Sequence, residues 1–405
     1  MTALARVRYA EKMAERVTAA SIVDLCTSED GVATACEAIE GFAENGQWQE
    51  LAGLAASLEG KGAAGNKADR VYFETVVDHA EDHLALCSGD GAVDAMLALS
   101  LAERQHSVVI ARSHALRERA FASRLGFGQP PEAFAAALGR VGTRAEYREI
   151  LACWMHEIVL RGHPLTDPAS VAFQAELVAA SHPLGGLPLT LRSVEREAPT
   201  YMPLYGEASL GSAIEALANQ PRAGHTMPPP ADPTSITAIQ VVPADDRLLA
   251  AVKPWAEGKR GKVEAKIFSL ANEVEPNAVG SWLLRTLPLE SIEGATKIVC
   301  VRVVGEGVFG PLFAAAANGG AYSPGFGGAY GRLAAWTSFG ALVGEPAHGL
   351  VDARALDALE ARSAACVYLS FRTPGPWFHD VAWDLGILAL RDDGKSVAVL
   401  AATDA

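Results

Sequence analysis

Two histidines at a four-residue spacing are the residues of this chain best suited to bind a metal ion. His79 and His83 lie in the sequence DHAEDH, in a stretch whose apolar residues recur at helical spacing. On a helix, a step of four residues places both imidazoles on one face, where they could share an ion. A later segment contains Glu103 and His106 in a Glu-x-x-His spacing, which carboxylate-bridged di-iron bundles use. The second Glu-x-x-His that such a centre requires is absent from the helical half, so the sequence favours a solvated polar face over a metal site.

A glycine-rich run from Gly305 to Gly331 follows an expected strand and precedes an expected helix. Glycines let backbone N–H groups converge on an anion, and a helix N-terminus adds a positive partial charge. The residues that would bind an anionic group or cofactor here are Gly325, Gly327, Gly328, Gly331 and Arg332. Their spacing matches neither G-x-G-x-x-G nor a P-loop, and it indicates no particular cofactor. A tightly turning loop whose aromatic side chains pack against the sheet is the alternative interpretation.

A cysteine, a histidine and two aspartates near the C-terminus could form a nucleophile, a base and an orienting group. These candidate catalytic residues are Cys366, His379, Asp380 and Asp384. They could act together only if the sheet brings them to one place. Cys366 lies in an apolar run, which favours a buried inert thiol, and His379-Asp380 could equally be a loop pair that hydrogen-bonds locally.

Composition indicates a globular protein of two domains. Half of the 405 residues are apolar, which is enough to bury substantial cores. No run approaches the roughly 18 apolar residues that cross a bilayer, and the charged N-terminus lacks the apolar region of a signal peptide. The six cysteines are scattered, without a C-x-x-C pair. We therefore expect reduced thiols, a cytoplasmic location and no membrane association.

The negative charge is concentrated in the first half of the chain. Residues 235–405 hold 15 Lys and Arg against 18 Asp and Glu, which leaves 19 and 30 for residues 1–234, a net charge of −11. Such a surface repels a phosphate backbone, so nucleic-acid binding is disfavoured. A basic protein partner suits this charge better.

Residues 1–219 are expected to form an α-helical array. Apolar residues recur at steps of three and four between about 28 and 162, and turn signals such as Asn45-Gly46 separate the segments. Frequent prolines from about residue 182 argue against regular helix or central strand there. The proline-rich residues 220–234 are the expected linker.

Residues 235–405 are expected to form an α/β domain with a mixed sheet. Strand patterns at 236–242, 263–270, 297–304 and 366–371 alternate with helical patterns at 245–255, 333–342 and 352–363. Asp393-Gly394 separates two apolar runs and predicts a closing β-hairpin. The fold class is therefore α+β in two modules.

The C-terminal sequence also resembles a known group of proteins. The stretch from Gly327 to Trp336, the sequence WFHDVAWDLGILAL and the closing VAVLAATD are similar to an uncharacterised family from high-GC bacteria of the actinobacterial type. The resemblance covers mainly residues 300–405. It implies no activity, and no functional residue is transferred from it.

Two functions of different classes fit these observations. The favoured one is a non-catalytic cytoplasmic protein that presents an acidic helical surface to a protein partner or assembles into a homo-oligomer. The alternative is a small-molecule enzyme whose site lies in the C-terminal domain at residues 305–331. Whether the chain is an enzyme stays open at this point.

Overall fold

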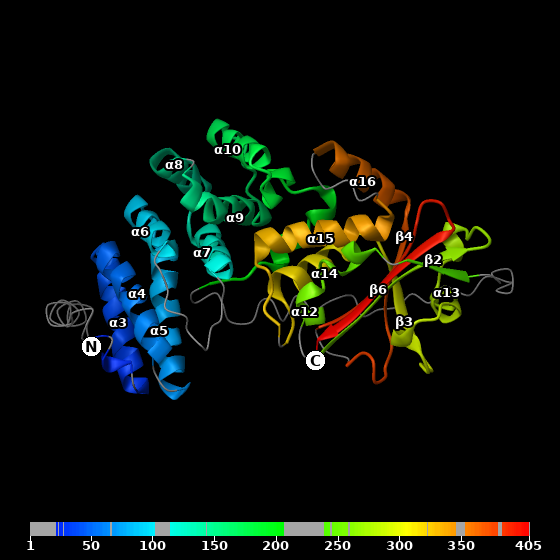
Figure 1. Ribbon diagram of the computed structural model, residues 1–405, viewed down its shortest axis with the longest axis horizontal. Helices are drawn as coiled ribbons and strands as arrows, with labels where there is room; N and C mark the ends of the chain where they lie inside the picture. Colours follow the sequence, from blue (N-terminus) through cyan, green and yellow to red (C-terminus); the bar gives the residue numbers. More distant parts are fainter. Residues whose placement is uncertain are drawn as a thin grey trace, which may run out of the picture. The chain divides into compact units, whose positions relative to one another are not determined.

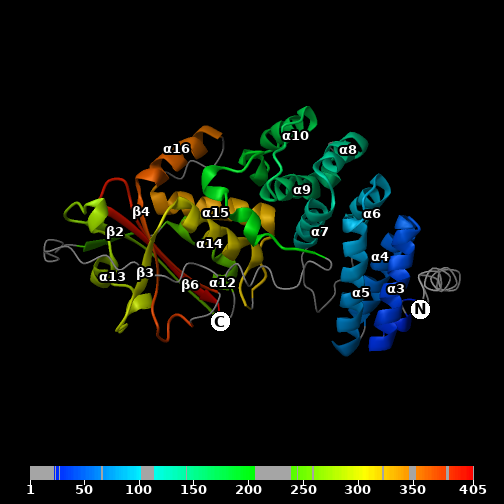
Figure 2. The same ribbon diagram turned by 180° about the vertical axis from the view of Figure 1, so that it is seen from behind.

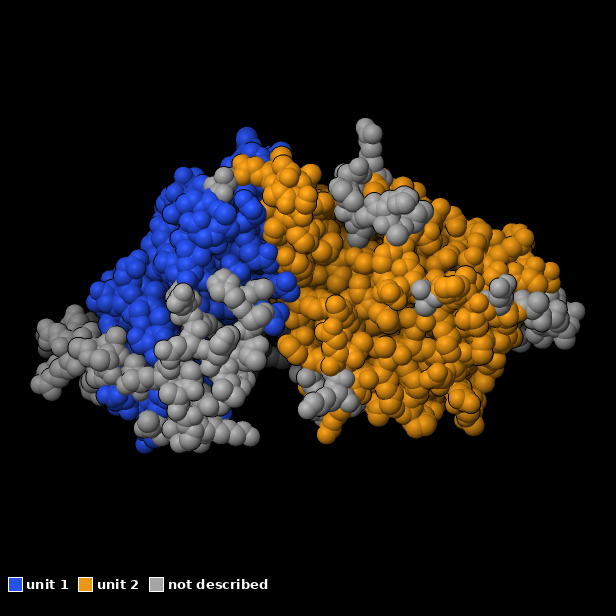
Figure 3. Space-filling view, in the orientation of Figure 1, with its two compact units in different colours: residues 1–158, 165–173, 204–209 blue, residues 159–164, 174–203, 210–405 orange. Residues whose placement is uncertain are grey.

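The computed structural model describes residues 22–404, except 23, 27, 65–66, 102–113, 143, 206–238, 244, 258–259, 322, 346–352 and 380–382. The chain forms two compact units (Figure 3). Unit 1 comprises Met1–Ile158, Leu165–Phe173 and Leu204–Ser209, and unit 2 comprises Val159–Pro164, Gln174–Pro203 and Leu210–Ala405. The proline-rich segment 174–203 thus packs with the C-terminal unit, whereas the linker expected at 220–234 lies outside the described residues.

The described part of unit 1 is built from helices, as the sequence predicts (Figure 1). Its helices are α3 (Glu29–Glu44), α4 (Trp48–Ala64), α5 (Lys67–Leu86), α6 (Asp90–Ser100), α7 (His114–Gly128), α8 (Pro131–Val141) and η1 (Ala145–Tyr147). Two further helices, α9 (Arg148–Leu160) and α10 (Pro168–Ala179), begin in unit 1, and their last residues belong to unit 2. The Ser28 hydroxyl accepts a hydrogen bond from the Gly31 N–H at 3.2 Å and caps α3. Gly46, with φ +66°, allows the sharp turn into α4.

Unit 2 contains a six-stranded sheet in the order β1-β2-β6-β5-β4-β3. Its strands are β1 (Ile239–Val242), β2 (Gly261–Leu270), β3 (Val299–Val303), β4 (Val367–Arg372), β5 (Asp384–Leu390) and β6 (Ser396–Asp404). Every strand pair in the described chain is antiparallel, so the expectation of a mixed sheet is wrong in this detail. The α+β class and the closing hairpin β5-β6 around Gly394 are confirmed.

The two faces of the sheet pack against different elements (Figure 2). Leu369, Val397 and Val399 face a core that includes Leu283 and Leu284 of α13 (Ser281–Thr286). The side chain of Tyr368, one residue from Leu369, points to the opposite face. There it stacks on Phe339 of α15 (Gly328–Val343), with ring centroids 6.2 Å apart. Alternate strand residues therefore serve two separate cores.

Short helices complete unit 2 around these layers. They are η2 (Pro183–Gly186), η3 (Ser193–Glu195), η4 (Ala198–Tyr201), η7 (Asp246–Leu249), α12 (Lys253–Glu257), η8 (Pro276–Ala278) and η9 (Glu290–Ile292), beside the longer α14 (Gly305–Asn318) and α16 (Ala353–Ala365). Within the described ranges, no helix has both the length and the hydropathy needed to cross a membrane.

Candidate metal centre

The two histidines of α5 lie at the edge of its buried face. Val76, Ala80 and Leu84 are fully buried, whereas His79 and His83 are half-buried. This is the position that the helical repeat predicts, because both imidazoles lie roughly 80° to 120° from the centre of the apolar stripe. Apolar packing therefore holds α5 while both rings keep one edge open to solvent.

A carboxylate from a neighbouring helix completes a group of three possible metal ligands. Glu40 of α3 approaches His79, with 3.5 Å between Oε1 and Nε2. The rings of His79 and His83 meet edge to face, with centroids 4.6 Å apart. One ligand atom from each of the three residues lies within 4.8 Å of the other two. The expected partners Glu103 and His106 lie outside the described residues, so the structure assigns neither to the site.

The local environment keeps His83 in the form that binds metals. Burial lowers the pKa of His83, and the neighbouring His79 lowers it further. Glu40, Asp82 and Glu44 act in the opposite direction but do not outweigh these two effects. A neutral imidazole has a free nitrogen lone pair, which is what a metal ion requires. The buried Nε2 of His79 has no hydrogen-bond partner among the described atoms, so a ligand would satisfy it.

The opposite flank of α5 is fixed by an arginine of α7. Arg124 is almost buried, and its Nε donates to Asp82 at 2.7 Å while its Nη2 donates to Asp78 at 2.9 Å. Its Nη1 lies 3.5 Å from a carboxylate oxygen of the buried Glu81. These contacts set the rotation of α5 about its axis, and with it the direction of the two imidazoles.

Two imidazoles and one carboxylate form a donor set for a divalent first-row transition metal. Zn²⁺ accepts such mixed nitrogen and oxygen ligands, and so do Fe²⁺, Co²⁺ and Ni²⁺. The sequence differs from the zinc-protease pattern H-E-x-x-H, because Ala80 rather than a glutamate follows His79. Glu81 contacts Arg124 instead. The geometry therefore supports metal binding and gives no general base at the position used by zinc proteases.

Among the described candidate catalytic residues of unit 2, Cys366 lies far from Asp384. Val367 of β4 pairs with Leu390 of β5, so Cys366 lies beside the C-terminal end of β5, whereas Asp384 is its first residue. At about 3.4 Å per residue, the length of β5 puts these two groups on the order of 20 Å apart. His379 is exposed, and its backbone N–H, rather than its ring, donates to Asp384 at 3.3 Å. Asp380 lies outside the described residues.

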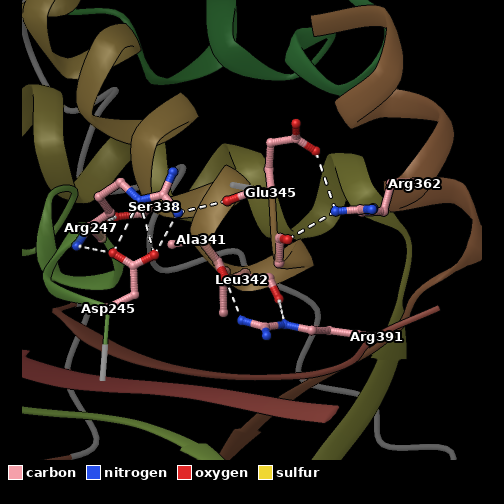
Figure 4. Close-up of polar contacts among 9 residues, drawn as sticks. Asp245, Arg247, Ser338, Ala341, Leu342, Glu345, Arg362 and Arg391 are labelled. Carbon is pink, nitrogen blue, oxygen red and sulfur yellow. Dashed lines mark hydrogen bonds and ion pairs between the residues drawn. The ribbon is translucent and has the colours of Figure 1, made fainter. Parts of the chain in front are cut away.

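The Cys366 thiol donates instead to the carbonyl of Arg362 at 3.4 Å. Arg362 belongs to a cluster of three arginines at the C-terminal end of α15 (Figure 4). Arg391 donates to the carbonyls of Ala341 and Leu342, Arg362 to that of Gly344, and Arg247 to that of Glu345. These carbonyls lie at the end of the helix, where that of Ala341 also accepts the Gly344 N–H at 3.3 Å, and the three cations supply further donors to them. Burial is the main cause that raises the pKa of Cys366, and the protonated thiol is unreactive.

The glycine-rich run is helical over half of its length, which corrects the expectation of a loop. Gly305–Asn318 forms α14, and Gly328 begins α15. Between them, the N–H groups of Phe326 and Gly327 donate to the carbonyls of Ala316 and Ala317. They satisfy the end of α14 and are not available to bind a phosphate.

The glycines of this run allow close packing, and Arg332 has internal partners. A Cβ at Gly331 would lie 2.6 Å from Ala317 Cα, and one at Gly325 would collide with the Ala317 carbonyl. Arg332 is fully buried; its Nε donates to Glu195 at 2.6 Å and its Nη1 donates to the Pro188 carbonyl at 2.8 Å. The arginine expected to attract an anion therefore attaches the segment around η3 to α15.

Sequence reasoning missed Glu40 and Glu195. Both are single acidic residues far along the chain from their partners. For Glu40, the one usable indication in the sequence was the acidic character of Glu29–Glu44, which contains several Asp and Glu residues and neither Lys nor Arg.

Comparison with known proteins places the chain in a family without assigning an activity. The model of a family of unknown function, DUF6183, matches residues 33–405. No curated protein and no solved structure matches the chain. The resemblance noted for residues 300–405 therefore extends over most of the sequence. On the strength of this match, the chain belongs to the DUF6183 family of unknown function.

Proposed function

We propose that unit 1 binds one divalent transition-metal ion through Glu40, His79 and His83. The observation that carries this proposal is the convergence of three ligand atoms, from two helices, within 4.8 Å of one another. Three protein ligands of this kind are the usual number at a zinc site that keeps a further coordination position. The buried Nε2 of His79 makes no hydrogen bond within the described part of the chain and lies 3.5 Å from Glu40 Oε1, which supports the same proposal.

The surface of α3 favours a cation. Its exposed residues include Glu29, Asp30, Glu37, Glu40 and Glu44, which recur along one side of the helix. No Lys or Arg lies within α3 to neutralise them. Such a row of carboxylates raises the local concentration of divalent cations beside the two histidines.

The same acidic row supports a second proposal, that the protein interacts with a basic protein partner or with another copy of itself. Unequal charge between the two halves is the observation that favours it, since residues 1–234 carry a net charge of −11. A cytoplasmic location belongs to the same proposal and is supported by the six cysteines, all of which are free thiols. Native mass spectrometry of the protein from its own host would detect a bound chain, and a monomer without one would contradict this proposal.

Metal binding is tested with chelator-treated protein and Zn²⁺ by isothermal titration calorimetry. We expect the unchanged protein to bind about one Zn²⁺ per chain. His79→Ala and His83→Ala should each lower the affinity for Zn²⁺ by more than the roughly 10–100-fold that loss of an outer-shell residue costs. His163→Ala is the matched control, because it removes an exposed histidine from unit 2. Absence of stoichiometric binding, or an equal loss in His163→Ala, would refute the proposal.

A further inference from the structure

We infer that Glu44 is the fourth ligand of this metal ion and closes the site into a tetrahedral centre that joins α3 to α5. The inference rests on the proposed metal site of Glu40, His79 and His83, and it adds the coordination number and the role of the metal. Glu44 is the last residue of α3, four residues after Glu40.

The connections between the helices determine which residues of α3 face His83. Residues 45–47 join α3 to α4, and residues 65–66 join α4 to α5. Such short connections reverse the chain twice, so α3 and α5 run in the same direction. The two helices also contact each other. Glu40 lies beside His79 at 3.5 Å, and a step of four residues along both helices places Glu44 beside His83.

The environment of Glu44 allows its carboxylate to reach the ion. The residue is exposed at the end of α3, where the Asn45-Gly46 turn leaves room for its side chain. In the structure, the group of converged ligand atoms comprises Glu40, His79 and His83 without Glu44, so the inference requires a change of the Glu44 rotamer that brings its carboxylate toward them.

Two imidazoles and two carboxylates satisfy the preference of Zn²⁺ for four ligands. With all four positions taken by the protein, no position is left for a reactive water, and the site is structural rather than hydrolytic. The metal would then attach α3 to α5, beside the contacts that attach α5 to Arg124. Because such an ion binds the folded chain, it should stabilise unit 1.

The test uses Co²⁺ as a spectroscopic substitute for Zn²⁺, because tetrahedral Co²⁺ absorbs far more strongly in the visible range than six-coordinate Co²⁺. We expect strong tetrahedral bands in the unchanged protein and weaker, shifted bands in Glu44→Gln, because water then replaces the carboxylate in a more open site. We also expect Glu44→Gln to lower the affinity for Zn²⁺ by more than the roughly 10–100-fold that loss of an outer-shell residue costs.

Glu37→Gln is the matched control, since it removes the same charge from the same exposed face of α3. It should keep the tetrahedral bands and lose less than about threefold in affinity, because the effect of an exposed charge is screened. Strong bands and full affinity in Glu44→Gln would overturn the assignment of Glu44 while the metal site itself stands. No binding of either metal to the unchanged protein would remove the metal site as well. Circular dichroism confirms that each variant is folded.

Discussion

Replacement of Glu195 by glutamine should destabilise unit 2 far more than the loss of an ordinary surface carboxylate. The side chain of Glu195 is fully buried and accepts four hydrogen bonds. Arg332 donates to both oxygens at 2.6 and 2.7 Å, Trp336 donates at 2.7 Å, and the backbone N–H of Arg192 donates at 2.8 Å. A glutamine amide would direct its own N–H groups at two of these four donors in either orientation and would remove the carboxylate charge that the buried Arg332 contacts through two nitrogens.

The size of the effect follows from these contacts. Removal of one partner from a buried ion pair costs about 3–5 kcal/mol, which is a large part of the roughly 5–15 kcal/mol by which a domain is stable. Glu306→Gln is the comparison, because Glu306 pairs with Arg196 at 3.5 Å and that arginine is 73% exposed. Loss of this surface pair should cost less than about 1 kcal/mol. Urea unfolding of both variants measures the difference, and a Glu195→Gln variant within about 1 kcal/mol of Glu306→Gln would refute the reasoning.

Two further predictions concern packing and pH. Gly331→Ala should destabilise unit 2 by about 1–3 kcal/mol, since its Cβ would lie 2.6 Å from Ala317 Cα. Gly41→Ala on α3 adds a Cβ that meets no atom within 4 Å, so it should stabilise unit 1 by about 0.5–1 kcal/mol. Urea unfolding midpoints equal to that of the unchanged protein would contradict both predictions. Burial opposes the charge of Glu264, yet hydrogen bonds from Lys266, Ser291 and Glu290 outweigh it and hold its pKa below the ordinary value. The charged form of Glu264 therefore stabilises the fold above the unfolded pKa of about 4.3, and this contribution is lost as pH falls through the lower folded pKa. Glu264→Gln should flatten the pH dependence of unfolding in that acidic window, and an unchanged slope would contradict the prediction.

Regular elements were predictable because they depend on local patterns. The helices of unit 1 begin and end at residues such as Ser28 and Asn45, whose side-chain chemistry is visible in the sequence. The closing hairpin followed from Asp393-Gly394 in the same way. These elements need only neighbouring residues for their definition.

Contacts between distant residues were not predictable from one sequence. Strand direction in the sheet depends on which strands become neighbours, and β2 pairs with β6 across more than a hundred residues. The glycines at 325 and 331 fit an anion loop by composition, but the close approach to Ala317 gives them another role. His79 and His83 were recognisable as a pair, whereas Glu40 became a partner only through the packing of α3 on α5.

The central claim is that Glu40, His79 and His83 hold a transition-metal ion. Anomalous X-ray diffraction at the zinc absorption edge, from crystals of the whole chain grown with Zn²⁺, tests it most directly. The account predicts an anomalous peak at coordination distance, about 2.0–2.2 Å, from a nitrogen of each histidine and an oxygen of Glu40. No peak there, with the two imidazoles and the carboxylate directed apart, would contradict it.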